Sequence, residues 1–214
     1  MKFSITALTL AMAAYVNAHG YFKSPPARLP GPGFRAECGD NAWYAMKGDI
    51  NGNIQGMQNQ IPAEKFAEGR CKIDKCKGMK WMDNKDRVQT YRQGQVVPME
   101  FDITAPHSGY ANVSIINLEF NTVMATLKTW DKYALTENSD FTGMEKFSVT
   151  IPDLKGKCVI AGRCAIQMFW HAPKDVDQTY ESCVDFKLAG NGKRDAVEER
   201  MHTRDFHYID EGLL

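Results

Sequence analysis

The chain has 214 residues, of which 43% are hydrophobic and 24% are charged, and its 26 basic and 26 acidic side chains leave no formal net charge. A length of this order suits one domain with a full hydrophobic core. Because basic side chains are not in excess, the composition argues against partners such as nucleic acid or an anionic membrane surface.

Residues 1–18 have the pattern of a secretory signal. Lys2 is the charged start, an apolar run follows, and small residues lead up to Ala18. We predict cleavage after Ala18, which makes His19 the mature N-terminus of a secreted, extracellular protein. Beyond this segment no apolar run approaches the ~20 residues that cross a bilayer, and the C-terminus does not resemble a lipid-anchor signal.

The chain has six cysteines, and an even number in an oxidising compartment predicts that all pair, as three disulfides. The six are Cys38, Cys71, Cys76, Cys158, Cys164 and Cys183. Sequence alone leaves every pairing open in principle. Turn-like residues between close neighbours favour the short loops Cys71–Cys76 and Cys158–Cys164, which leaves Cys38–Cys183 as the long bridge. A sequon at Asn112 predicts N-glycosylation.

Residues 19–94 are rich in Gly, Pro, Asn and Gln and lack sustained periodicity. They predict long loops with short helices, one of them near 63–68. From Gly94 onward, short apolar or alternating runs separated by turn residues predict an antiparallel β-sandwich. The six runs are 95–104, 111–117, 123–130, 145–151, 164–170 and 180–188.

The last of these runs alternates in character. Tyr180 and every second residue after it form a core face, whereas the alternate residues, beginning with Glu181, form a face that is solvated or bridged. Residues 189–214 lose the pattern and become charged. We interpret the chain as a signal peptide (1–18), one domain (19–188) and a C-terminal tail (189–214).

A histidine at a mature N-terminus carries two nitrogen donors on one residue. The free α-amine and the ring Nδ1 can together close a chelate ring on a metal ion, which no internal histidine can do. Chance placement of His19 after the cleavage site is the alternative interpretation. A metal site therefore requires a second ligand elsewhere in the chain.

Two further residues could supply that ligand. His107 lies between two predicted strands, where a proline and a glycine favour an irregular turn, and its alternative role is that of a surface loop histidine. Tyr180 begins the last predicted strand, and its alternative role is that of a core tyrosine. A Cys38–Cys183 disulfide would tie the N-terminal segment to this strand and bring His19 near Tyr180.

Five short motifs, taken in order, resemble those of fungal or oomycete lytic polysaccharide monooxygenases, and in particular the cellulose-active group called auxiliary activity family sixteen. The motifs are His19-Gly20-Tyr21, Ser24-Pro25-Pro26-Ala27-Arg28, Gly52-Asn53-Ile54-Gln55-Gly56, Ala105-Pro106-His107-Ser108-Gly109 and Gln178-Thr179-Tyr180-Glu181-Ser182-Cys183-Val184-Asp185-Phe186. The resemblance covers residues 19–188.

This resemblance implies an all-β fold, an immunoglobulin- or fibronectin-like antiparallel β-sandwich, that holds one copper ion in a "histidine brace". The His19 amine and Nδ1 and a His107 ring nitrogen would be the equatorial ligands, with Tyr180 axial. Such a nitrogen set suits Cu(II), whereas zinc prefers a tetrahedral set. Gln178 matches the position that hydrogen-bonds to oxygen at the copper. His171 departs from the group's pattern and is either a support for the site or a surface histidine.

Crystalline polysaccharide requires a flat binding face, and Tyr21, Trp43 and Tyr44 are the candidate aromatic contacts. The resemblance implies a monomeric enzyme that oxidises cellulose rather than chitin, at the anomeric carbon, with an external electron donor and hydrogen peroxide or dioxygen. A non-catalytic polysaccharide-binding module and a copper-handling protein are the alternatives. Glycoside hydrolysis requires two facing carboxylates, and no motif places such a pair beside the metal site.

Overall fold

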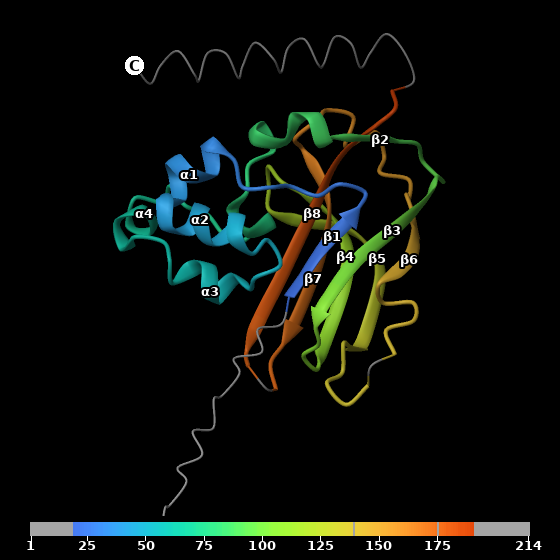
Figure 1. Cartoon of the computed structure of the whole chain (residues 1–214). Helices are drawn as coiled ribbons and strands as arrows, with labels where there is room; N and C mark the ends of the chain where they lie inside the picture. Colours follow the sequence, from blue (N-terminus) through green and yellow to red (C-terminus); the bar gives the residue numbers. More distant parts are fainter. Residues whose placement is uncertain (1–18, 139, 175, 191–214) are drawn as a thin grey trace, which may run out of the picture.

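The computed structural model describes residues 19–190, apart from residues 139 and 175 and the side chain of His19. Two β-sheets pack face to face, and short helices lie beside them (Figure 1). This arrangement confirms the predicted all-β sandwich with long N-terminal loops and short helices. The predicted signal peptide, and the predicted tail from residue 191 onward, lie outside the described residues.

The smaller sheet has three antiparallel strands in the order β1 (His19–Ser24), β3 (Val96–Ala105) and β6 (Lys146–Thr150). Strand β1 was not predicted, because a six-residue strand with a glycine at its second position shows little alternation. Its pairing comes from β3, and the register places His19 opposite Ala105.

The larger sheet has five strands, four of which come from the predicted sandwich region. In spatial order they are β2 (Gln89–Tyr91), β8 (Gln178–Leu188), β7 (Cys164–Ala172), β4 (Gly109–Asn117) and β5 (Thr122–Tyr133). The short strand β2 pairs in parallel with β8, and the other neighbours are antiparallel. All six predicted runs are strands, with ends that differ from the prediction by a few residues.

Aromatic side chains fill the space between the sheets. Phe22 of β1 and Phe101 of β3 meet edge to face at 5.2 Å between ring centroids. Trp170 of β7 packs over the ring of Tyr180 at 4.5 Å. All four side chains are fully buried, so the core runs without interruption from the first strand to the last.

A helical layer, defined here as residues 32–87, packs beside the sandwich and against β8 (Figure 1). Its elements are α1 (Pro32–Cys38), α2 (Asp40–Gly48), α3 (Ile54–Gln58), α4 (Ala63–Ala67) and the 3-10 helices η1 (Cys76–Gly78) and η2 (Trp81–Arg87). Helix α4 confirms the helix predicted near 63–68. The layer has its own small core, which includes Phe34, Met46 and Met57.

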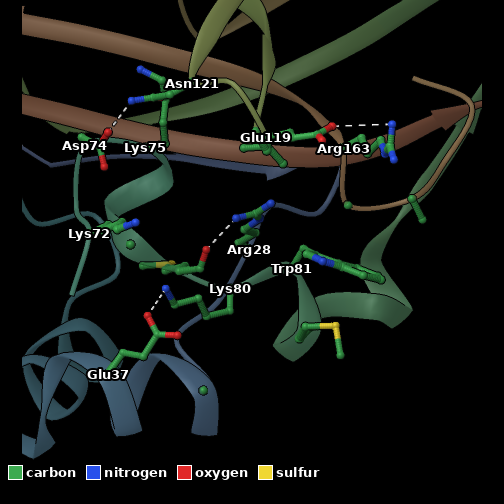
Figure 2. A pocket seen from close by; sticks show the side chains of 17 residues that line it. Arg28, Glu37, Lys72, Asp74, Lys75, Lys80, Trp81, Glu119, Asn121 and Arg163 are labelled. Carbon is green, nitrogen blue, oxygen red and sulfur yellow. Dashed lines mark hydrogen bonds and ion pairs between the residues drawn. The ribbon is translucent and has the colours of Figure 1, made fainter. Parts of the chain in front are cut away.

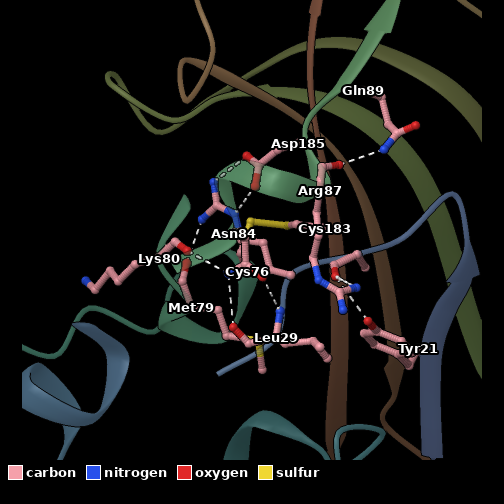
Figure 3. Close-up of polar contacts among 12 residues, drawn as sticks. Tyr21, Leu29, Cys76, Met79, Lys80, Asn84, Arg87, Gln89, Cys183 and Asp185 are labelled. Atoms are coloured by element: carbon pink, nitrogen blue, oxygen red, sulfur yellow. Dashed lines mark hydrogen bonds and ion pairs between the residues drawn. A yellow bond between two sulfur atoms is a disulfide. The ribbon is translucent and has the colours of Figure 1, made fainter. Parts of the chain in front are cut away.

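The outer face of β8, predicted to be solvated or bridged, is buried under this layer. Glu181, Cys183 and Asp185 are each less than 5% exposed, and Figure 3 shows Cys183 and Asp185 facing the segment that carries Cys76. Asp185 accepts two hydrogen bonds of 2.7 Å from the guanidinium of Arg28. The face therefore joins the layer to the sandwich instead of meeting water.

The disulfides differ in part from the predicted pairing. Cys158–Cys164 is confirmed. The predicted Cys38–Cys183 and Cys71–Cys76 bridges are wrong, because the structure joins Cys38 to Cys71 and Cys76 to Cys183. The reason is that Cys71 packs in the core of the helical layer whereas Cys76 packs over β8. The residues between them link two clusters instead of closing a loop.

Asn112, the predicted glycosylation site, lies in the middle of β4 and is half-buried. Its Oδ1 accepts a hydrogen bond of 3.0 Å from the Ser114 hydroxyl. Occupancy by a glycan stays a prediction. Within residues 19–190, no helix has the length and apolar character needed to span a membrane.

We expect the Cys76–Cys183 bridge to contribute more stability than Cys158–Cys164. Their sequence separations are 107 and 6 residues, for which loop-closure entropy gives about 5 and about 2 kcal/mol. Urea unfolding of the Cys76→Ser/Cys183→Ser and Cys158→Ser/Cys164→Ser double variants measures the difference. Non-reducing peptide mapping that joins Cys38 to Cys183 would contradict the arrangement.

Candidate metal centre

Three of the predicted site residues, His19, His107 and Tyr180, lie at one end of the sandwich. Strand β3 ends at Ala105 in one sheet and β4 begins at Gly109 in the other, so the turn between them crosses the sheets. His107 lies in this turn and is 7% exposed. Because His19 pairs with Ala105, the start of β1 lies beside the turn, as Figure 1 also shows.

The backbone next to His19 is held tightly against the core. Gly20 donates a 3.1 Å hydrogen bond to the carbonyl of Asn51. A Cβ atom at this position would lie 2.6 Å from the ring of Phe101 and 3.2 Å from Trp170, so only glycine lets the strand approach so closely. Since Trp170 packs on Tyr180, the start of β1 and the phenol of β8 belong to one packed unit.

The Tyr180 phenol donates a short hydrogen bond to Oε1 of Gln178. Burial raises the pKa of Tyr180 above its ordinary value, although a hydrogen bond with Asn53 opposes this. The phenol therefore stays protonated at neutral pH. Because the carbonyl of Gln178 is occupied by this bond, its amide N–H groups are the part of the side chain that can donate to a ligand.

His171 lies on the outward face of β7, whereas its neighbour Trp170 points into the core. Its Nδ1 is 3.1 Å from the hydroxyl of Thr179, which also binds the side chain of Gln55. Its ring meets the exposed ring of Tyr110 edge to face at 5.6 Å. The side chain of His171 is 22% exposed, and its role stays open. Tyr110, which the sequence analysis missed, directly follows the His107 turn at the start of β4.

The three predicted substrate aromatics lie in different settings. Tyr21 is half-buried and its hydroxyl donates to the carbonyl of Ala27. Trp43 on α2 is also half-buried, with its indole N–H donating to the carbonyl of Pro30 at 3.2 Å. Tyr44, next to it, is 59% exposed. A substrate role for each stays a prediction.

The donor chemistry at this end fits a small, nitrogen-rich metal site. His107 brings an imidazole and Tyr180 brings a neutral phenol oxygen. The backbone of His19 pairs with Ala105, just before the His107 turn, and β1 packs against β8. Among the described side chains no group of three or more His, Cys, Asp or Glu residues forms a metal cluster. A site here would therefore depend on His19, whose side chain lies outside the described part.

A buried lysine below this end was not predicted, because lysines are rarely buried. Lys77 is 1% exposed, and its ammonium donates to the carbonyls of Ile50 at 2.9 Å and Gly52 at 2.6 Å. Its backbone N–H donates to Glu181 at 3.3 Å. Burial lowers the pKa of Lys77 to about 8 and raises the pKa of Glu181 to about 7, and attraction between the two charges opposes both shifts.

A cavity of about 810 Å³ lies at the opposite end of the sandwich, near the end of β4 and the start of β7 (Figure 2). Its lining includes two ion pairs, Lys80 with Glu37 and Arg163 with Glu119. Trp81 forms part of its wall. This cavity is separate from the candidate metal centre, and the sequence predicted no site there.

Residues 19–186 match the family described as "lytic polysaccharide mono-oxygenase, cellulose-degrading". The match covers most of the chain and includes the turn with His107 and the start of β8. The chain belongs to this family of polysaccharide monooxygenases. A search of the curated proteins finds no match.

Several solved structures are similar to the chain at low identity. One is a cellulose-active lytic polysaccharide monooxygenase in complex with copper, with 13% identity, a TM-score of 0.42 and coverage of 81% of this chain and 100% of that one. Another, from Thermobia domestica, belongs to auxiliary activity family fifteen, with 17% identity, a TM-score of 0.43 and coverage of 80% and 99%. A chitin binding domain from Burkholderia pseudomallei has 10% identity, a TM-score of 0.41 and coverage of 80% and 100%.

Glu181 should make stability depend on pH. Its folded pKa of about 7 lies above the ordinary value of 4.5, so its contribution is complete below pH 4.5 and is lost as the pH rises through 7. The comparison variant is Glu181→Gln, which keeps an acceptor for the Lys77 N–H. Between pH 4.5 and 7 the free energy of unfolding of the wild-type protein should fall by up to about 3 kcal/mol relative to that of the variant. Urea unfolding at several pH values measures this. Parallel curves for the two proteins would show that Glu181 titrates normally.

Proposed function

We propose that the mature chain is a secreted, copper-dependent monooxygenase that oxidises cellulose. Cleavage after Ala18 frees the His19 amine; this amine, the His19 ring Nδ1 and a His107 ring nitrogen would hold one copper ion, and the Tyr180 phenol would be a further, weaker ligand. The observation that carries the proposal is the register of β1, which pairs His19 with Ala105, two residues before His107. Such a nitrogen set suits Cu(II).

Bound copper, reduced by an external electron donor, would supply activation of hydrogen peroxide or dioxygen, so that a C–H bond beside a glycosidic bond is hydroxylated. The residues around it hold and shape the site. The protonated phenol of Tyr180 offers a weak, neutral oxygen ligand. Gln178, whose carbonyl is occupied by Tyr180, has N–H groups left to donate to an oxygen atom of the co-substrate. The hydroxylated sugar then eliminates, which breaks the chain.

Cellulose, attacked at the anomeric carbon, is the proposed substrate, and auxiliary activity family sixteen the proposed group. The motifs of the sequence and the cellulose-degrading description of the family support this choice. Binding would use exposed rings: Tyr44 on α2, and Tyr110, which is 45% exposed beside the His107 turn. The enzyme is proposed to act outside the cell as a monomer, with residues 19–188 as the catalytic domain.

Copper binding should require cleavage after Ala18. One extra residue before His19 converts the amine into an amide, which is not a comparable donor and blocks the chelate. We expect such a protein to bind Cu(II) more than ~100-fold more weakly, since even the loss of a supporting hydrogen bond costs up to about that much. Calorimetric titration of both forms measures the ratio. Equal affinities would refute the brace.

His107→Ala should abolish oxidation of cellulose, because it removes one of the three nitrogen donors. The control is His171→Ala, which changes a histidine that contacts Thr179 and Tyr110 at the same end and should still release oxidised products. Mass spectrometry of soluble products from cellulose, with ascorbate and copper, is the measurement. Oxidised oligosaccharides from His107→Ala at the wild-type rate would place the metal elsewhere. Binding to cellulose without any products from wild-type protein would indicate a non-catalytic module.

A further inference from the structure

The ammonium of Lys77 occupies an unusual position for a lysine. It is enclosed in the protein and held by two main-chain carbonyls, those of Ile50 and Gly52. The backbone of Lys77 has φ of 54°, in the left-handed region that side-chain-bearing residues rarely adopt. Enclosing a charged group in this way is costly unless its hydrogen bonds are made. The loop that provides the carbonyls is therefore strongly constrained.

The same loop holds the start of β1. Three successive carbonyls are divided between two partners: those of Ile50 and Gly52 accept from Lys77, and the one between them, from Asn51, accepts from the N–H of Gly20 at 3.1 Å. Holding the outer two carbonyls restricts the direction of the middle one. Lys77 is thus linked to Gly20, the neighbour of His19, through one loop.

Lys77 is itself anchored to β8 at two points. The preceding residue, Cys76, forms the disulfide with Cys183. The Lys77 N–H donates to Glu181, which directly follows Tyr180 in the chain. The start of β1 and the phenol of β8 are therefore connected through one continuous series of contacts.

We propose that Lys77 is a positioning residue for the metal centre: its ammonium sets the 50–52 loop, which holds Gly20 and thereby places the His19 amine beside the His107 turn. The inference rests on the proposed function, since it takes that amine as a copper ligand. The competing account is that Lys77 contributes only to overall stability. If Lys77 is a positioning residue, its replacement should loosen the Gly20 N–H in a protein that is otherwise folded. If Lys77 contributes only to overall stability, the Gly20 N–H should stay as it is in the folded protein.

Lys77→Met tests this in the mature protein, because it keeps most of the side-chain volume and removes all three donors. The matched control is Lys72→Met, which changes an exposed lysine five residues earlier. In metal-free protein, hydrogen exchange of the Gly20 amide, followed by nuclear magnetic resonance, should be roughly tenfold or more faster in Lys77→Met and unchanged in Lys72→Met. The Cu(II) electron paramagnetic resonance spectrum should change in Lys77→Met alone.

Each result decides between the accounts. Unchanged Gly20 exchange in folded Lys77→Met protein overturns the proposal, as does faster exchange with a wild-type copper spectrum. If wild-type protein binds no copper, the proposed function fails on its own, whereas an unchanged Gly20 exchange rate counts only against Lys77. If Lys77→Met does not fold, Lys77→Gln takes its place. Its shorter amide retains two N–H donors, and it should show an intermediate increase at Gly20; no increase there overturns the proposal.

Discussion

The outer face of β8 is the constraint on which the rest of the structure depends. Three alternate residues, Glu181, Cys183 and Asp185, are buried there, and two of them carry carboxylates that are costly to remove from water without partners. Each has a partner in the N-terminal half: the Lys77 N–H, Cys76 and Arg28, respectively. The Arg28–Asp185 pair is bidentate, which fixes orientation as well as distance. The glycine- and proline-rich region is consequently a defined layer rather than a set of loose loops.

The inner face of the same strand positions β1. The hydroxyl of Ser182 accepts a 3.0 Å hydrogen bond from the N–H of Phe22, and Tyr180 packs on Trp170, which meets Gly20. Both faces of β8 therefore help to hold β1: the inner face contacts it directly, and the outer face anchors Lys77, which holds the 50–52 loop. The start of β1 is held beside the His107 turn by contacts that originate largely on another strand.

Much of the sandwich could be predicted because its strands after Gly94 are long enough to show alternation. Strand β1 could not, since its pairing with β3 is decided by tertiary contacts. The disulfides were mispredicted in part because spacing indicates which cysteines are close in sequence, not which cluster each one packs in. His107 and Tyr180 were found through motifs and lie at one end of the fold, whereas Lys77 gave no signal because burial of a lysine depends on carbonyls brought together by folding.

The contacts of β1 bear on the proposed cleavage after Ala18. Strand β1 pairs with β3 from His19 onward, and the N–H groups of Gly20 and Phe22 also donate to Asn51 and Ser182. The proposed cleavage after Ala18 would therefore place a free amine at the start of a strand that β3 and β8 hold beside the His107 turn.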